Sequence, residues 1–92
     1  LATAAITTGN TGTVACSVQR GLYTVSVSGT FVGTVHLQRA FEDGPGADDW
    51  RDVKAYTGAT EENGEAAEVQ AVRLFVKTGN FTSGTADVRV SQ

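Results

Sequence analysis

Short segments in which apolar residues alternate with small or polar ones recur along this chain, and they constrain its fold more than any other feature. In residues 23–28 each large apolar residue is followed by threonine or serine, and residues 86–91 alternate in the same manner. Residues 35–41 form a third such set, and a fourth has one face made of Val14, Cys16 and Val18. Because successive side chains of a strand point to opposite faces, a period of two predicts half-buried β-strands.

Two further segments complete the predicted strands. Residues 50–56 predict a strand whose register the pattern leaves open, and Val69 to Val76 is apolar on both faces, as expected of a central strand. Residues 66–72 contain good helix formers, but their β-branched continuation favours a strand. The predicted fold is therefore all-β: a small antiparallel β-sandwich or jelly-roll-like barrel of about six to eight short strands.

Gly-Thr pairs lie at the predicted strand ends, at residues 12–13, 29–30, 33–34 and 84–85. Glycine supplies the positive φ that a tight turn needs, and threonine favours the extended chain beside it. These pairs indicate turns, because they are too short to form a structural repeat.

The 92 residues are enough for one small domain and leave no room for a second core. Residues 1–13 are small and uncharged, and they lack the alternating pattern until their end. A loosely ordered terminus is one interpretation of this segment. The other is an N-terminal arm over 1–13 that crosses a neighbouring subunit, with Leu1 among its contacts and Ile6 as its anchor. Residues 14–92 then form the β-sandwich domain.

Charge and composition exclude several classes of function. Seven basic and ten acidic residues give a net charge of −3, which argues against nucleic acid as a partner. No apolar run approaches the roughly 18–20 residues of a membrane span. The single cysteine, Cys16, cannot form an internal disulfide, and we expect it to be a small buried apolar residue. A cytoplasmic assembly route fits this composition better than a secreted, disulfide-stabilised one.

Residues 37–53 hold five acidic side chains around the only proline and the only tryptophan of the chain. Gly44-Pro45-Gly46 cannot continue a strand, so the segment predicts a hairpin with a long charged tip. The spacing does not fit an EF-hand, which leaves an irregular calcium site from Asp43, Asp48 and Asp49 as the alternative. Carboxylates at an exposed tip are too well solvated for acid–base catalysis.

Aromatic residues and the single histidine suggest no cofactor. Trp50, Tyr56 and Tyr23 form a sugar-binding platform in one interpretation, and pack in the core in the other. His36 lies on the polar face of its strand, and a zinc site lacks further ligands. The expected place for His36 is the surface or an interface, and the chain is expected not to be an enzyme.

Residues 20–41 (RGLYTVSVSGTFVGTVHLQRAF) and 50–53 (WRDV) resemble small all-β virion structural proteins of tailed bacteriophages. The family pattern is roughly V-x-G-T-F-x-G-T-V-x-L-Q-R-S-F, then D-G-G, then W-x-D-V. Here Ala40 replaces the serine, and the tryptophan follows Asp43-Gly44 after a longer insertion. Residues 81–91 also resemble the C-terminal strand of such proteins, so the similarity covers most of residues 20–91.

The resemblance implies a capsid decoration (cement) protein that binds the major capsid protein on the outer surface of the virion after assembly in the host cytoplasm. It implies a homotrimer over three-fold positions of the shell, with no catalytic residue and no cofactor. The residues expected to contact a partner are Leu1, Ile6, Asp43, Asp48, Asp49 and Trp50. The alternatives are a tail or baseplate component, and a module that binds glycans at the virion surface.

Overall fold

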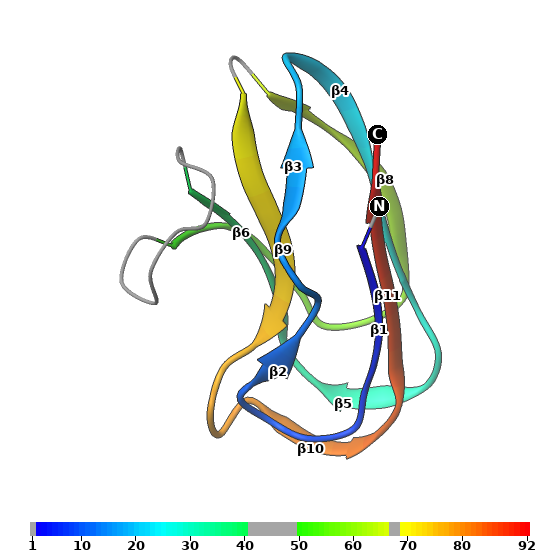
Figure 1. Cartoon of the computed structure of the whole chain (residues 1–92). Coiled ribbons are helices and arrows are strands. Elements are labelled where there is room, and N and C mark those ends of the chain that lie inside the picture. Colours follow the sequence, from blue (N-terminus) through cyan, green and yellow to red (C-terminus); the bar gives the residue numbers. More distant parts are fainter. Residues whose placement is uncertain (1, 41–49, 67–68) are drawn as a thin grey trace.

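The computed structural model describes residues 2–40, 50–66 and 69–92, and every regular element among them is a β-strand (Figure 1). Two sheets face each other, and a small two-stranded sheet lies at their base. The strands are β1 (Ala2–Ile6), β2 (Thr11–Gly12), β3 (Cys16–Val18), β4 (Gly21–Ser28), β5 (Phe31–Gly33), β6 (Val35–Ala40), β7 (Arg51–Tyr56), β8 (Thr60–Ala66), β9 (Gln70–Val76), β10 (Phe81–Gly84) and β11 (Ala86–Ser91).

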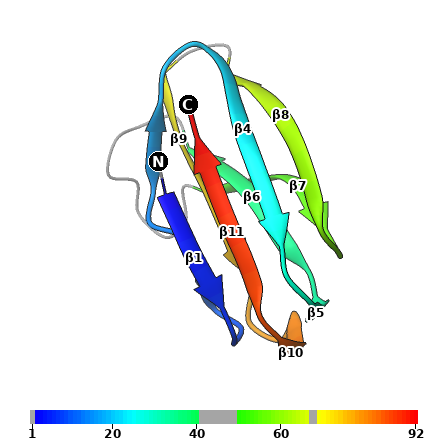
Figure 2. The same cartoon turned by 90° about the vertical axis from the view of Figure 1, so that its right-hand side faces the viewer.

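One sheet has the order β1-β11-β4-β8, and all its neighbours are antiparallel (Figure 2). Tyr23, Val25 and Val27 of β4 are buried, whereas Thr24 and Ser28 between and after them are exposed. The face of β4 that packs in the core is thus the one that the alternating pattern selected.

The opposite sheet has the order β2-β9-β6-β7, with β3 also paired to β9. β9 has partners on both sides and is largely buried on both faces, which confirms the predicted central strand. Residues 70–72 belong to this strand, so the β-branched continuation outweighed the helix formers that precede it.

The predicted fold class is confirmed: the chain is all-β and forms a small antiparallel sandwich. The described residues contain eleven strands, more than the pattern indicated, and three of the additional ones (β2, β5 and β10) are only two to four residues long. Alternation is not detectable over so few residues. In the same part of the chain, no helix is long and apolar enough to cross a bilayer.

The structure differs from the predicted N-terminal arm. Residues 2–6 form β1 and pair along their whole length with β11, from Ala2 opposite Val90 to Ile6 opposite Ala86. Ile6 is only 2% exposed and belongs to the core, so it is not available as an anchor for another subunit. The alternation is hard to detect in this segment because the other inward positions, Ala2 and Ala4, are small alanines. Leu1 lies outside the described residues.

Val14 is also placed differently from the prediction, since it is 75% exposed while Cys16 and Val18 are buried. The backbone N–H of Thr13 donates to the carbonyl of Leu74, and Cys16 pairs with Val72. From residue 13 to residue 16, three steps along the chain therefore match two steps of β9, and the extra residue forms a β-bulge between β2 and β3. The extra residue turns Val14 outward and leaves Cys16 buried, as expected for a small apolar residue.

The base of the sandwich is closed by β5 and β10, where the rings of Phe31 and Phe81 stack with centroids 6.4 Å apart.

All four Gly-Thr pairs lie at strand ends, but positive φ explains only Gly29 and Gly84. Gly12 is required for a different reason, because a Cβ there would lie 2.3 Å from the carbonyl oxygen of Leu74.

Candidate binding surface

Strand β7 is the most exposed element of the two large sheets. It pairs with β6 on one side and has no strand on the other among the described residues. Every residue from Arg51 to Ala55 is exposed, and only Tyr56 is buried. The structure thus confirms a strand after Trp50 and places it at the edge of the sheet. The predicted hairpin tip at 44–46 lies outside the described residues.

A β-bulge sets the direction of the side chains on β7. Leu37 pairs with Lys54 and Gln38 pairs with Asp52, so Val53 is an extra residue without a partner on β6. Bulges re-aim the neighbouring side chains. As a result Asp52 shares the outer face of the sheet with Gln38, whereas Lys54 shares the inner face with Leu37.

The outer face carries a hydrogen-bonded network centred on Asp52. Gln38 Nε2 donates to Asp52 Oδ1 at 2.9 Å, and Lys77 Nζ donates to Asp52 Oδ2 at 2.5 Å. Arg73 Nε donates to Gln38 Oε1 at 2.8 Å, so both ends of this buried amide are satisfied. The bond from Lys77, and then that from Gln38, hold the pKa of Asp52 below its usual value.

The guanidinium of Arg73 lies between two aromatic rings, 4.3 Å from the centroid of Trp50 and 4.2 Å from that of Phe75. Such cation–π contacts are favourable for arginine. Burial lowers the pKa of Arg73. Half-buried Trp50 therefore packs against the outer face of the sheet, with one side of its indole covered by the guanidinium.

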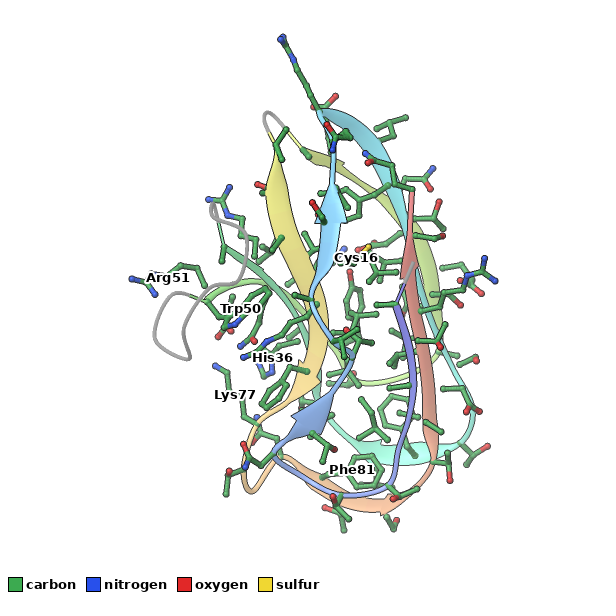
Figure 3. The ribbon with its side chains drawn as sticks, in the orientation of Figure 1. Cys16, His36, Trp50, Arg51, Lys77 and Phe81 are labelled. Carbon is green, nitrogen blue, oxygen red and sulfur yellow. The ribbon has the colours of Figure 1, made fainter. Side chains whose placement is uncertain are left out.

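His36 lies on the same outer face as Trp50 and Lys77, as Figure 3 shows. It is half-buried and pairs with Phe75 of β9 and Ala55 of β7. Its Nδ1 is fully enclosed and has no hydrogen-bond partner, the only side-chain atom of this kind in the described part of the chain. No second imidazole exists in the sequence to build a metal site with it.

The inner side of β7 faces β8 across one long edge of the sandwich. The Tyr56 hydroxyl donates to Glu62 Oε1 at 2.6 Å, and Lys54 Nζ contacts Glu62 Oε2 at 2.8 Å. Lys54 and then Tyr56 lower the pKa of Glu62 by hydrogen bonding. Burial is the main cause of the raised pKa of Tyr56. One carboxylate thus connects the two sheets at this edge.

The structure separates the residues that were predicted to act together. Tyr23 and Tyr56 are buried in the core, so the predicted platform of three aromatic rings is wrong. Trp50 lies against Arg73 on the outer face of the β9-β6-β7 sheet, and Ile6 lies in the core at the opposite edge of the sandwich. Asp43, Asp48 and Asp49, and with them the alternative calcium site, lie outside the described residues.

Sequence reasoning missed Gln38, Arg73 and Lys77, which form the network with Asp52. The available signal was Arg73, the only charged residue in the apolar run from Val69 to Val76. A charge within a central strand needs a partner, but the pattern does not identify that partner.

Within residues 2–40, 50–66 and 69–92, no three metal-ligating side chains come together. Comparison with family models, with curated proteins and with solved structures finds no match to this chain.

Proposed function

We propose that the protein is a non-enzymatic virion structural protein that decorates the outer surface of a bacteriophage capsid and stabilises the shell. The resemblance of residues 20–41, 50–53 and 81–91 to small virion proteins supports this class. The observation that carries the proposal is the exposed edge of β7, which has a neighbour on only one side among the described residues.

The edges of the two sheets are not equivalent. The edge formed by β1 packs beside β2 of the opposite sheet. The edge formed by β8 carries Glu61, Glu62 and Glu65. β7 presents the 49% exposed side chain of Val53 between charged neighbours. Among the described residues it therefore offers both a backbone edge with no neighbouring strand and an apolar contact to a partner.

The expected mode of binding is strand addition, in which a segment of the capsid protein pairs with the free edge of β7. Main-chain hydrogen bonds supply affinity in this mode, and alternate side chains supply specificity. A bulge and charged side chains restrict indiscriminate pairing of an exposed edge. β7 has both, so we expect it to accept a complementary strand and to resist aggregation.

Shell stabilisation then follows from mass action. A protein that binds only the assembled shell shifts the equilibrium towards that shell, and many copies each bridging two subunits add their effects. No reacting group is needed for this function.

The test uses particles of the source phage assembled without the protein. Added protein is expected to bind them and to raise the temperature at which they release DNA. Val53→Lys should weaken binding by about tenfold or more, since an exposed apolar contact is replaced by a charge. Val14→Lys is the matched control, because Val14 is an exposed bulge valine elsewhere on the same sheet. Equal binding by both variants would contradict the role of β7.

A tail or baseplate location would use the same edge for a different partner. Antibody labelling of intact particles distinguishes the two, since a decoration protein places label over the head.

The proposed trimer is tested by light scattering behind a sizing column. A mass of three chains is expected, and a monomer would contradict a preformed trimer.

A further inference from the structure

Strand β8 adds little apolar surface to the core of the sandwich. Its inward positions are held by Thr60, Glu62, Gly64 and Ala66, and only Ala66 among them is buried. The neighbouring strand β4 instead buries Tyr23 and two valines. In the described part of the chain β8 also lies at the edge of its sheet, with no strand on its outer side. It is therefore attached by hydrogen bonds more than by apolar packing.

Two sets of contacts hold β8 in place. One is the ladder with β4, which runs from Gly21 opposite Ala66 to Val27 opposite Thr60. The other is the pair of bonds that Glu62 accepts from side chains of β7. A cleft of about 300 Å³ lies between β7 and β8, lined by Tyr23, Arg39, Asp52, Val53, Glu65 and Gln70. Segments with few buried apolar contacts open locally at low free energy, so we expect β8 to open before the rest of the sandwich.

Strand β8 contains the one Asn-Gly step in the chain, Asn63-Gly64. Glycine places no Cβ in the way when its backbone nitrogen attacks the side chain of the preceding asparagine. In that reaction the nitrogen of Gly64 bonds to Cγ of Asn63, and the bond from Cγ to the side-chain nitrogen breaks. Ammonia leaves and carries the proton of the Gly64 N–H. Water then opens the cyclic imide to aspartate or to isoaspartate.

The fold requires the glycine that makes Asn63 reactive. Gly64 pairs with Tyr23 across the ladder, and a Cβ at residue 64 would lie 2.4 Å from Cζ of Tyr23. A bulkier residue that would protect Asn63 therefore does not fit there.

The closed strand holds Asn63 away from the reactive geometry. Its backbone is extended, and its side-chain oxygen accepts a hydrogen bond from the Thr24 hydroxyl at 3.2 Å. The five-membered imide ring does not form in an extended strand, so the reaction needs β8 to leave the ladder. Asn63 is exposed at an edge strand, where such opening gives it direct access to water.

We infer that Asn63 is a site of spontaneous deamidation, gated by local opening of β8. An isoaspartate adds an atom to the main chain, so the residues before and after it cannot both keep their register with β4. The new carboxylate also lies between Glu61 and Glu65 on the same face of β8. Both changes hold β8 open and weaken the connection of Glu62 to β7. This modification site goes beyond the proposed decoration function.

The test follows deamidation of the purified full chain by peptide mass mapping, during incubation at mildly alkaline pH and below the unfolding temperature. The two other asparagines are internal controls, since Thr11 follows Asn10 and Phe81 follows Asn80. Asn63 should convert about tenfold faster than either control, because only its successor lacks a Cβ.

Two variants test whether opening of β8 controls the rate. Tyr56→Phe removes one bond to Glu62 and should raise the rate at Asn63 about fivefold, the factor that one lost hydrogen bond gives. Ile6→Val is the matched control, because it lowers global stability by a similar amount on the opposite side of the sandwich. It should leave the rate at Asn63 unchanged.

Hydrogen exchange of the converted chain provides a second measurement. Exchange should become faster in residues 60–66, and β11 should keep its protection. The inference is overturned if Asn63 converts no faster than Asn10 and Asn80. It is also overturned if Ile6→Val accelerates conversion as much as Tyr56→Phe, since the reaction would then proceed through global unfolding. The test uses no shell, so its outcome is independent of the proposed decoration function.

Discussion

The two long sides of the sandwich are closed by different kinds of interaction. On one side β1 packs beside β2, and Ile6 is buried among the valines of the core. On the other side the carboxylate of Glu62 joins β8 to Tyr56 and Lys54 of β7, and a cleft remains beside it. The first closure is apolar and the second is polar and incomplete.

This difference indicates where binding is possible. Burial of apolar surface is non-directional and closes a gap completely, whereas a few hydrogen bonds connect two strands only at fixed points. The exposed edge of β7, the bulge at Val53 and the cleft all occur on the polar side. The apolar side supplies stability, and the polar side is left with surfaces that a partner or ligand can use.

The largest effect is expected on the apolar side. Ile6→Ala should lower the free energy of unfolding by about 2–5 kcal/mol, because it removes a buried side chain and leaves a cavity. Urea unfolding followed by tryptophan fluorescence measures this change. Thr3→Ala, on the exposed face of β1, is the control and should be close to neutral. If Ile6→Ala instead left stability unchanged and abolished self-association, residues 2–6 would act as an arm and not as a strand.

A smaller effect is expected where the polar side depends on close backbone contact. Gly64→Ala places a methyl group against the ring of Tyr23, which must shift. We expect a loss of about 1–3 kcal/mol, as for other overpacked sites, together with altered resonances at the cleft. Gly58→Ala is the matched control, since a Cβ there meets no atom within 4 Å. Equal stability of the two variants would show that Tyr23 does not rest on β8.

The two sides also differ in how well the sequence predicts them. Alternation identified β4 and β11 because their inward residues are large. It missed β1, because the inward residues Ala2 and Ala4 have too little apolar surface to produce a detectable alternation. It misplaced Val14 because a bulge shifts the phase of the pattern, and a one-residue shift exchanges the two faces of a strand.

The candidate surface was less predictable than the fold. The network of Gln38, Asp52 and Lys77 joins residues from three parts of the chain, and it depends on the register of β6 with β7 and on the bulge at Val53. The cleft likewise depends on Tyr23 lying against Gly64. Strand pairing in space determines both, and a single sequence does not specify that pairing.

The smallest expected effect concerns the Tyr56–Glu62 bridge, and it distinguishes polar from apolar closure by its dependence on pH. Tyr56→Phe should cost about 1 kcal/mol at pH 7, the usual value of one hydrogen bond. Lys54, and then Tyr56, hold the pKa of Glu62 below its usual value in the folded chain. The contribution of the Tyr56–Glu62 bond is therefore present above the unfolded pKa of Glu62 and is lost as pH falls through the folded value. The difference between wild type and Tyr56→Phe should therefore shrink below the ordinary glutamate pKa of 4.5. The loss caused by Ile6→Ala should stay constant over the same range, and parallel pH profiles for both variants would show that the bridge contributes nothing to this edge.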